Sequence, residues 1–430
     1  MKIKYLVCAL LLISSLPLMA RDHNKGDHHN RGWQTIPVET EMHINDDEGM
    51  DKTINPACAF DTLVNPVDGT PVDNTFRFYY KEGKSDNVLV FFNGGGSCWN
   101  DATCVASLAL ANIPGNRPTY NPSVLQQNSP VGAGGVFDDD NDDNPFKDWN
   151  KVFIPYCTGD LHAGSNEVAY TDVDGTITGY PGAPVSVKHH GFDNFMAVRE
   201  WMKQQFKGKK DKLEKLLVTG SSAGGYGAIL NFPYVQSAFP KTKVSLLADA
   251  SASVVTEGFI NDVFTLDKNW NLDESLPPIF SDGLGIYSAA GLNVELFQRL
   301  TEAYPKNRFA QYTTAQDFVQ VLFLKLMDQL DNGNTNPILW ALNETDFLYF
   351  KQWNERMTAS HDYLSETTDN YQYYIGAGNV HTILTDAFAT PGIPHPFYDE
   401  QSAQGVKFSD WLARFANARK FRDKSVQYQQ

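Results

Sequence analysis

Short apolar segments recur along the chain and are separated by polar or glycine-bearing stretches. Most of them are continuous apolar runs, which is the pattern of strands buried on both faces of a parallel sheet. The first one alternates instead, as in a strand with one exposed face. The predicted strands are residues 76–80, 87–92, 152–156, 216–218, 243–248, 308–312 and 371–375.

Between these segments apolar residues recur every three or four positions, the spacing of an amphipathic helix. Such helices are predicted at residues 192–202, 318–326 and 408–415. Strands that alternate with helices imply an α/β fold with a mostly parallel sheet covered on both faces. Residues 257–305 show no clean alternation, and we interpret them as an insertion that shapes a pocket.

The first 20 residues have the form of a secretory signal peptide, because two lysines precede an apolar run that ends in small residues. The run is too short to span a membrane, although an N-terminal anchor is the alternative. The polar residues 21–35 are expected to form a mobile tether. No linker divides residues 36–430, which are predicted to form a single domain. The mature protein would be secreted or periplasmic.

Four cysteines remain after the first 20 residues: Cys58, Cys98, Cys104 and Cys157. An even number in an exported chain favours two disulfides. Cys98 and Cys104 are close enough to close a small loop, which would leave Cys58 with Cys157, but spacing alone does not decide the pairing. Free buried thiols are the alternative, and no cysteine pair has the spacing of zinc ligands.

The net charge of -16 argues against nucleic acid or an anionic membrane as a partner. We therefore expect neither as a partner of the chain. A monomer is expected separately, and the charge does not bear on it. The acidic residues 138–144 resemble a calcium loop, but Asp143 stands where the sharp-turn glycine belongs and Trp149 where the closing glutamate belongs. A solvated acidic loop fits better, so neither a metal nor another cofactor is expected.

A candidate nucleophile lies where the strand at residues 216–218 runs into Gly220, Ser221, Ser222, Ala223 and Gly224. G-x-S-x-G between a strand and a helix is the nucleophile-elbow pattern, in which the middle serine projects from the end of the sheet. Ser222 is that serine. A glycine- and serine-rich turn also occurs for purely steric reasons, so the rest of the site has to be found elsewhere in the chain.

Three glycines at residues 94–96 directly follow the buried strand at residues 87–92. Backbone N–H groups of such a loop can approach a ligand closely and form an oxyanion hole. We expect Gly95 and Gly96 to share this role with Ala223, although a flexible turn would give the same pattern. Ser221 beside the nucleophile and Trp99 after the glycines are predicted to contact substrate.

Residues 157–164 follow the strand at residues 152–156. Loops at the C-terminal ends of strands are where α/β sheets bind ligands, so Asp160 and His162 are candidate substrate contacts.

The general base and the acid are chosen by chain order, which in α/β-hydrolases runs nucleophile, acid, histidine. His381 follows the last predicted strand in a glycine-bearing loop, whereas His361 and His395 follow no strand. Asp317 follows the penultimate strand and could orient the imidazole. It could also be only a helix cap, and Asp249 is the rival acid.

Seven segments together resemble the pectinacetylesterase and Notum family of serine carboxylesterases over residues 60–411, almost all of the mature chain. They are, in chain order, NGGGSCW, VFIPYCTGDLHAG, VTGSSAGGYGA, LLADASA, QYTTAQDFVQ, GNVHTIL and FSDWL. The resemblance implies an α/β-hydrolase fold and a triad of Ser222, Asp317 and His381. It also places Gly95, Gly96 and Ala223 in the oxyanion hole.

The chain departs from the family at two places. Plant members have tryptophan before the glycine-loop cysteine, where this chain has Ser97 and places Trp99 after the cysteine. Residues 259–349 match poorly, and family members use that region to shape specificity. The expected activity is hydrolysis of an ester, in the first place an O-acetyl ester of a polysaccharide such as pectin. A serine peptidase, a lipid or polyester hydrolase, and a non-catalytic carbohydrate-binding protein are the alternatives.

Overall fold

The computed structural model describes residues 32–45, 49–64, 69–113, 116–125, 128–209, 213–264, 269–281, 288–388, 396–417 and 425–427. The predicted signal peptide, most of the predicted tether and His395 lie outside these ranges. The elements, contacts and counts of the molecule are those of the residues in these ranges.

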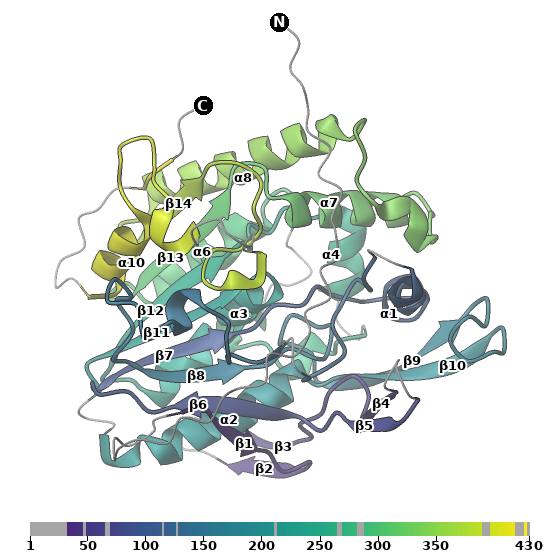
Figure 1. The fold of residues 1–430 in the computed structure, drawn as a ribbon, viewed down its shortest axis with the longest axis horizontal. Coiled ribbons are helices and arrows are strands. Elements are labelled where there is room, and N and C mark those ends of the chain that lie inside the picture. The colour runs from purple at the N-terminus through teal and green to yellow at the C-terminus, as the bar shows by residue number, and fades with distance from the viewer. Residues whose placement is uncertain are drawn as a thin grey trace, which may run out of the picture.

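An eight-stranded sheet runs through the centre of the molecule in the order β1-β6-β8-β7-β11-β12-β13-β14. The strands from β8 to β14 are parallel, and β6 is antiparallel both to β8 and to the edge strand β1. Figure 1 shows the strands stacked across the molecule. Their bounds are β1 Gln34–Pro37, β6 Arg77–Lys81, β7 Asn87–Phe92, β8 Asn150–Ile154, β11 Lys215–Ser221, β12 Lys243–Asp249, β13 Arg308–Thr314 and β14 Tyr371–Gly376.

Both faces of this sheet are buried, as the continuous apolar runs predicted. Along β7, Val88, Val90 and Phe92 pack into one core, while Leu89 and Phe91 pack into a second core on the opposite face. The first core contains residues of α2 Gly191–Gln205, α3 Ala223–Ala238, α6 Leu292–Ala303 and α8 Phe347–Thr367. The second contains α10 Phe408–Asn417. The predicted α/β-hydrolase-like class of fold is therefore confirmed.

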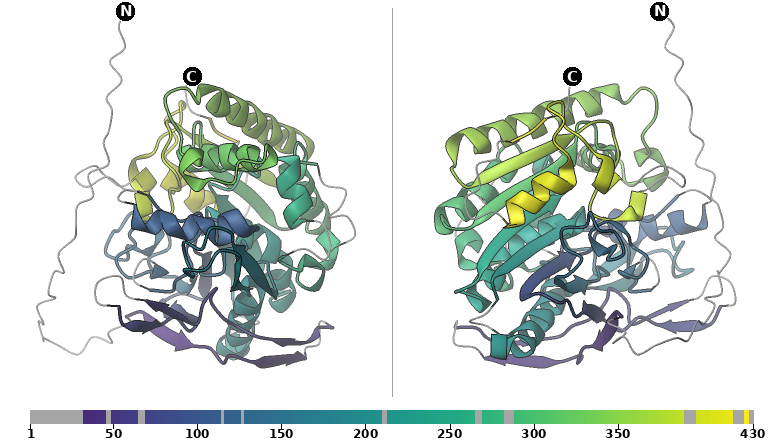
Figure 2. Two further views of the ribbon diagram at one scale, coloured as in Figure 1. Left: turned by 90° about the vertical axis from the view of Figure 1, so that its right-hand side faces the viewer. Right: turned by 60° about the vertical axis from the view of Figure 1, so that its left-hand side comes forward.

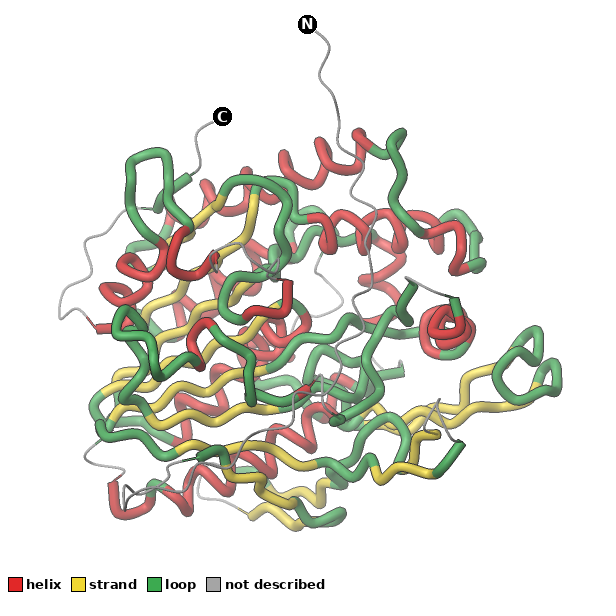
Figure 3. The backbone as a smooth tube through the Cα atoms, in the orientation of Figure 1, coloured by secondary structure: helices red, strands yellow, loops and turns green. Residues whose placement is uncertain are grey.

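Three short antiparallel hairpins accompany the sheet. They are β2 Met42–Asn45 with β3 Asp51–Ile54, β4 Thr62–Val64 with β5 Pro71–Asp73, and β9 Asn166–Asp172 with β10 Ala183–His189. The hairpin of β9 and β10 projects from the body of the molecule (Figure 3). The strand pair β2 and β3 lies at the opposite end of the molecule from α7 Phe318–Asp331 and α8 (Figure 2).

Several sequence expectations about elements are corrected. The expected first strand is β6, the sixth of the chain, because the earlier strands are too short to show a period. β1 begins at Gln34, so residues 34 and 35 belong to the sheet and not to the tether. The region 257–305 contains α4 Glu257–Val263, α5 Pro278–Ser281 and α6. The long helix α8 was not predicted. The remaining α-helices of the described residues are α1 Asp101–Cys104 and α9 Pro396–Asp399.

Two disulfides join the predicted cysteines, Cys58 with Cys157 and Cys98 with Cys104. The first links positions 99 residues apart, and the second closes a loop directly after the three glycines. In the acidic loop, Asp139 pairs with Lys81 and Lys151, while Asp142 pairs with Lys147 at 2.6 Å. Lysines on neighbouring segments therefore neutralise part of this loop.

His361, one of the rival candidates for the general base, is buried on α8 and packs edge-on against the rings of Tyr371 and Tyr373. Burial lowers the pKa of His361 to about 3. The histidine is therefore neutral in the folded protein at pH values where the unfolded chain, with an ordinary pKa near 6.5, binds a proton.

His361→Gln should make the stability less sensitive to acid. The His361 contribution is complete above pH 6.5 and is lost as the pH falls toward 3, at about 1.4 kcal/mol per pH unit. Without it, the free energy of unfolding should fall less steeply between pH 6 and pH 4 by about that amount per pH unit. Urea denaturation at a series of pH values measures the slope, and an unchanged slope would contradict the buried neutral state.

Candidate active site

Ser222 occupies the turn between β11 and α3 with φ 57° and ψ -126°. This left-handed conformation is unusual for a serine and is the strained turn that a nucleophile elbow requires. The neighbouring glycines make the turn possible, because a Cβ on Gly224 would lie 1.9 Å from the carbonyl oxygen of Phe92 and one on Gly220 would lie 2.6 Å from it. The turn is thus held against the end of β7, where the three glycines begin.

His381 lies after β14 and meets Asp317, which lies after β13. Nδ1 of the imidazole is 2.8 and 2.9 Å from the two carboxylate oxygens of Asp317. Asp317 is fully buried and His381 is 4% exposed. The hydrogen bond leaves Nε2 of His381 as the atom that can accept a proton.

Asp317 also caps α7, since its carboxylate accepts hydrogen bonds from the backbone N–H groups of Val319 and Gln320 at 3.1 and 3.0 Å. The side-chain amide of Gln320 donates a further one at 2.8 Å. The two sequence interpretations of Asp317, helix cap and partner of His381, are therefore compatible. The cap fixes the carboxylate that orients the imidazole.

The glycine loop lies beside the elbow. Gly96 has φ 77° and pairs with Tyr120, and a Cβ at this position would lie 1.9 Å from the carbonyl oxygen of Thr119. Among the described residues, none accepts a hydrogen bond from the backbone N–H of Gly95 or Gly96. Ala223 begins α3, so its N–H is one of the unsatisfied donors at a helix N-terminus. These donors are available to a negatively charged oxygen.

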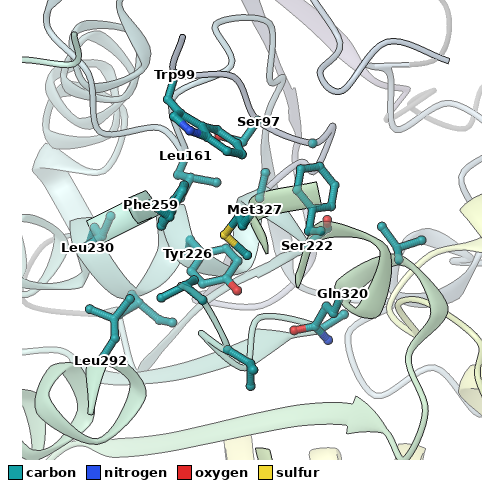
Figure 4. A pocket seen from close by; sticks show the side chains of 18 of the residues that line it. Ser97, Trp99, Leu161, Ser222, Tyr226, Leu230, Phe259, Leu292, Gln320 and Met327 are labelled. Atoms are coloured by element: carbon teal, nitrogen blue, oxygen red, sulfur yellow. The ribbon is translucent and has the colours of Figure 1, made fainter. Parts of the chain in front are cut away.

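Ser222 and His381 line one cavity of about 70 Å³. Figure 4 shows the side chain of Ser222 at this cavity. Gly96, Ala223 and Trp99 line the same cavity, as three of the predicted residues should. The indole of Trp99 packs edge-on against Phe259 of α4, with ring centroids 4.9 Å apart. Gly95 is not among the lining residues, although its neighbour Gly96 is.

The rest of the cavity is strongly apolar, which the sequence alone did not reveal. Most of its side chains come from α3, α4, α6, α7 and α8, which are brought together only by folding. Figure 4 shows Tyr226, Leu230, Phe259, Leu292 and Met327 around it. The complete set of further lining residues is Ser97, Leu161, Tyr226, Ile229, Leu230, Ala250, Val254, Val255, Phe259, Phe264, Leu292, Leu296, Val319, Gln320, Phe323, Met327 and Trp353.

Asp160 and His162, the predicted substrate contacts, do not line the cavity. Both are buried: the Asp160 carboxylate accepts the N–H of Gly191 at 2.7 Å, and Nε2 of His162 lies 2.9 Å from the carbonyl oxygen of Asn93. Burial raises the pKa of Asp160 to about 6 and lowers that of His162 to about 4. The residue between them, Leu161, lines the cavity, so this loop contributes an apolar side chain.

Ser221, a predicted substrate contact, does not line the cavity. Asp249, the rival candidate for the triad acid, does not bond the imidazole of His381. The hydroxyl of Ser221 donates to the carboxylate of Asp249 at 2.7 Å, and both residues are buried. Asp317, and not Asp249, holds Nδ1 of His381.

The comparison with solved structures concerns the fold of the chain. A structure described as the Wnt deacylase Notum from Drosophila matches with a TM-score of 0.50, covers 86% of this chain and 95% of its own, and is 14% identical. At that identity the match concerns the fold alone, and it agrees with the α/β-hydrolase-like architecture.

The sequence comparisons show which family the chain resembles. A family model described as Pectinacetylesterase matches residues 62–262. A palmitoleoyl-protein carboxylesterase notum2 from Xenopus laevis is 26% identical over 216 residues, which are 49% of this chain and 36% of that protein. Pectin acetylesterase 11 from Arabidopsis thaliana is 29% identical over 179 residues, 40% of this chain and 39% of that one. The resemblance to the pectinacetylesterase and Notum family is therefore confirmed.

These alignments span little more than a third of the length of the curated relatives. Residue 262 ends the family match within α4, so α6, α7, α8 and the His381 loop lie beyond it. In the part of the chain that the structure describes, no helix is long and apolar enough to cross a membrane.

Proposed function

We propose that this protein is a serine carboxylesterase in which Ser222 is the nucleophile, His381 the general base and Asp317 the acid that orients it. One observation carries the proposal: a serine on a strained strand-to-helix turn and a histidine held by a buried carboxylate line the same cavity. A buried His–Asp pair on its own could equally be a purely structural interaction. Its position beside an elbow serine in a cavity is what supports catalysis.

In this mechanism Nε2 of His381 takes the proton of the Ser222 hydroxyl as Oγ attacks the carbonyl carbon of an ester. The N–H groups of Gly95, Gly96 and Ala223 stabilise the oxyanion, each such donor contributing about 3 kcal/mol to the lowering of the barrier. The imidazolium then gives its proton to the departing alcohol, which leaves an acyl-serine. Water activated by His381 attacks this second ester and releases the acid with a free Ser222.

The apolar cavity supports an acyl group longer than acetyl. An acetyl group offers one methyl to a cavity whose walls carry many large apolar side chains. Each buried methylene stabilises the complex by about 0.8 kcal/mol, which corresponds to about a fourfold increase in the binding constant. The second candidate function is removal of O-acetyl groups from a polysaccharide. The similarity of this chain to a pectin acetylesterase supports it.

A series of p-nitrophenyl esters from acetyl to palmitoyl distinguishes the two candidates. We expect kcat/KM to rise by at least about tenfold from the acetyl to the octanoyl ester, because several methylenes enter the cavity. Leu292→Phe, on the side of the cavity away from Ser222 in Figure 4, should reduce the octanoyl rate and spare the acetyl rate. Highest activity on acetyl esters, together with acetate release from acetylated pectin, would instead support the polysaccharide substrate.

We further propose that the chain is exported and acts as one catalytic domain without a cofactor. The signal-like N-terminus and two disulfides support export, since disulfides persist in oxidising compartments. The triad needs only its own residues and water. Release of a mature form that begins after residue 20, detected by mass spectrometry of the periplasm or medium, tests this part of the proposal.

A further inference from the structure

Asp249 is a buried carboxylate for which the mechanism above has no role. It ends β12 next to the elbow and is fully buried. A buried charge destabilises the fold unless hydrogen bonds satisfy it. The hydrogen-bond partners of Asp249 therefore indicate which segments its carboxylate holds together.

The partners of Asp249 come from both halves of the site. Its Oδ2 accepts the hydroxyl of Ser221 at 2.7 Å, the N–H of Ile383 at 3.0 Å and the N–H of Leu384 at 3.1 Å. Ser221 directly precedes the nucleophile, and Ile383 and Leu384 follow His381 within three residues. One oxygen therefore joins the elbow to the histidine loop, across 134 residues of sequence at Ile383.

The backbone of Asp249 holds the nucleophile as well. Its carbonyl oxygen accepts the N–H of Ser222 at 2.8 Å. The hydroxyl of Ser251 lies 2.7 Å from the carbonyl oxygen of Ser222 and 3.0 Å from that of Asp249. The conformation of Ser222 is therefore fixed from the strand that carries Asp249.

The histidine loop needs such an anchor. Thr382, between His381 and the two anchored amides, has φ 62°, which is a strained value for a threonine. On the other side of the histidine, the hydroxyl of Thr314 donates to the carbonyl oxygen of Val380 at 2.9 Å. On the C-terminal side the loop is held by Asp249, together with backbone hydrogen bonds from Val136 N–H to the carbonyl oxygen of Leu384 at 3.0 Å and from Asp386 N–H to that of Ala133 at 2.7 Å. Of these attachments, only that of Asp249 also bonds the elbow, and a displacement of the loop by about 1 Å would cost about 100-fold in rate.

We propose that Asp249 is a positioning residue that fixes the distance between Ser222 and His381 by bonding both of their segments through one carboxylate oxygen. The inference rests on the proposed function, because it concerns the alignment of that nucleophile and that base. Burial raises the pKa of Asp249 to about 6, and the hydroxyl and amide donors oppose this rise, so the carboxylate is ionised at neutral pH. Hydrogen bonds to an ionised group are the stronger kind.

Three variants separate positioning from an acid role and from mere stability. Asp249→Ala removes the whole anchor, Ser221→Ala removes one donor, and Asp249→Asn keeps an oxygen that can occupy the place of Oδ2. We expect kcat to fall about 100-fold in the first and about tenfold in the second. The kcat of Asp249→Asn should stay within about tenfold of wild type. KM should change less than about twofold in all three variants, because none of them removes a side chain that lines the cavity.

Thr219→Val is the matched control. Its hydroxyl donates to the carbonyl oxygen of Leu247 at 2.7 Å, between the same two strands, and bonds neither Asp249 nor the histidine loop. This variant should lose some stability in thermal denaturation and keep the wild-type kcat. A proportional loss of stability and kcat in all four variants would reduce Asp249 to a structural role and overturn the inference.

Two further outcomes are decisive. Wild-type kcat in Ser221→Ala would overturn the inference even if Asp249→Ala failed to fold. Asp249→Asn as inactive as Asp317→Asn would make Asp249 a catalytic acid instead. Labelling of Ser222 by a fluorophosphonate is measured in parallel, because wild-type protein that neither reacts with it nor hydrolyses esters would refute the proposed function itself.

Discussion

Ser222→Ala should lower the rate of ester hydrolysis by about 10⁶-fold, the size of loss measured when the nucleophile of a triad is removed. The reason is that no other hydroxyl can replace one held at φ 57° beside the oxyanion donors and His381. The measurement is kcat on a p-nitrophenyl ester that the wild-type protein hydrolyses, together with mass spectrometry of the acyl-enzyme.

The matched control is Ser251→Ala. That serine is buried next to the elbow and donates toward the carbonyl oxygen of Ser222 without facing the cavity, so its loss should cost far less than that of Ser222. A Ser222→Ala variant that retains a rate near wild type, with its fold intact by circular dichroism, would remove this serine from the mechanism.

The second large effect is expected from Asp317→Asn, which should lower kcat by about 10⁴-fold. An amide in this place can present its NH₂ group to Nδ1 of His381 and so favour the wrong imidazole tautomer. Because Asn can still cap α7 through its side-chain oxygen, the loss should appear in kcat much more than in thermal stability.

Comparison with Asp249→Asn decides between the two carboxylates. The geometry places Asp317 on the imidazole and Asp249 on the amides of the histidine loop, so the first variant should be the more damaging by a wide margin. A larger loss in Asp249→Asn would exchange the two roles.

The fold and part of the site were predictable from local sequence. The strand at residues 87–92 is apolar at every position except the first, which is the pattern of a strand covered on both faces. The elbow is encoded within five residues, since the turn depends on Gly220 and Gly224 having no Cβ. The hairpin of β9 and β10 was not predicted, since its two strands carry no continuous apolar run. The helix α8 was not predicted either, because exposed apolar residues such as Phe347 and Leu348 obscure its buried stripe.

The residues that misled prediction were those whose environment depends on distant segments. Asp160 and His162 have the chemistry and the loop position of substrate contacts. The amide of Gly191 and the carbonyl of Asn93 satisfy them in the interior instead, and these partners lie 31 and 69 residues away in the chain. No local pattern distinguishes a polar group that will be buried and bonded from one that will face a ligand.

The sequence by itself therefore determined the class of fold, the candidate serine and the candidate histidine, because short-range sterics and chain order are written in consecutive residues. Only the tertiary structure decided which carboxylate meets His381, which polar residues are internal, and that the cavity beside Ser222 is apolar. The partnership of Asp317 with His381 joins positions 64 residues apart, and the cavity joins five helices. Contacts of this range arise from packing of the whole chain, and local sequence carries no record of them.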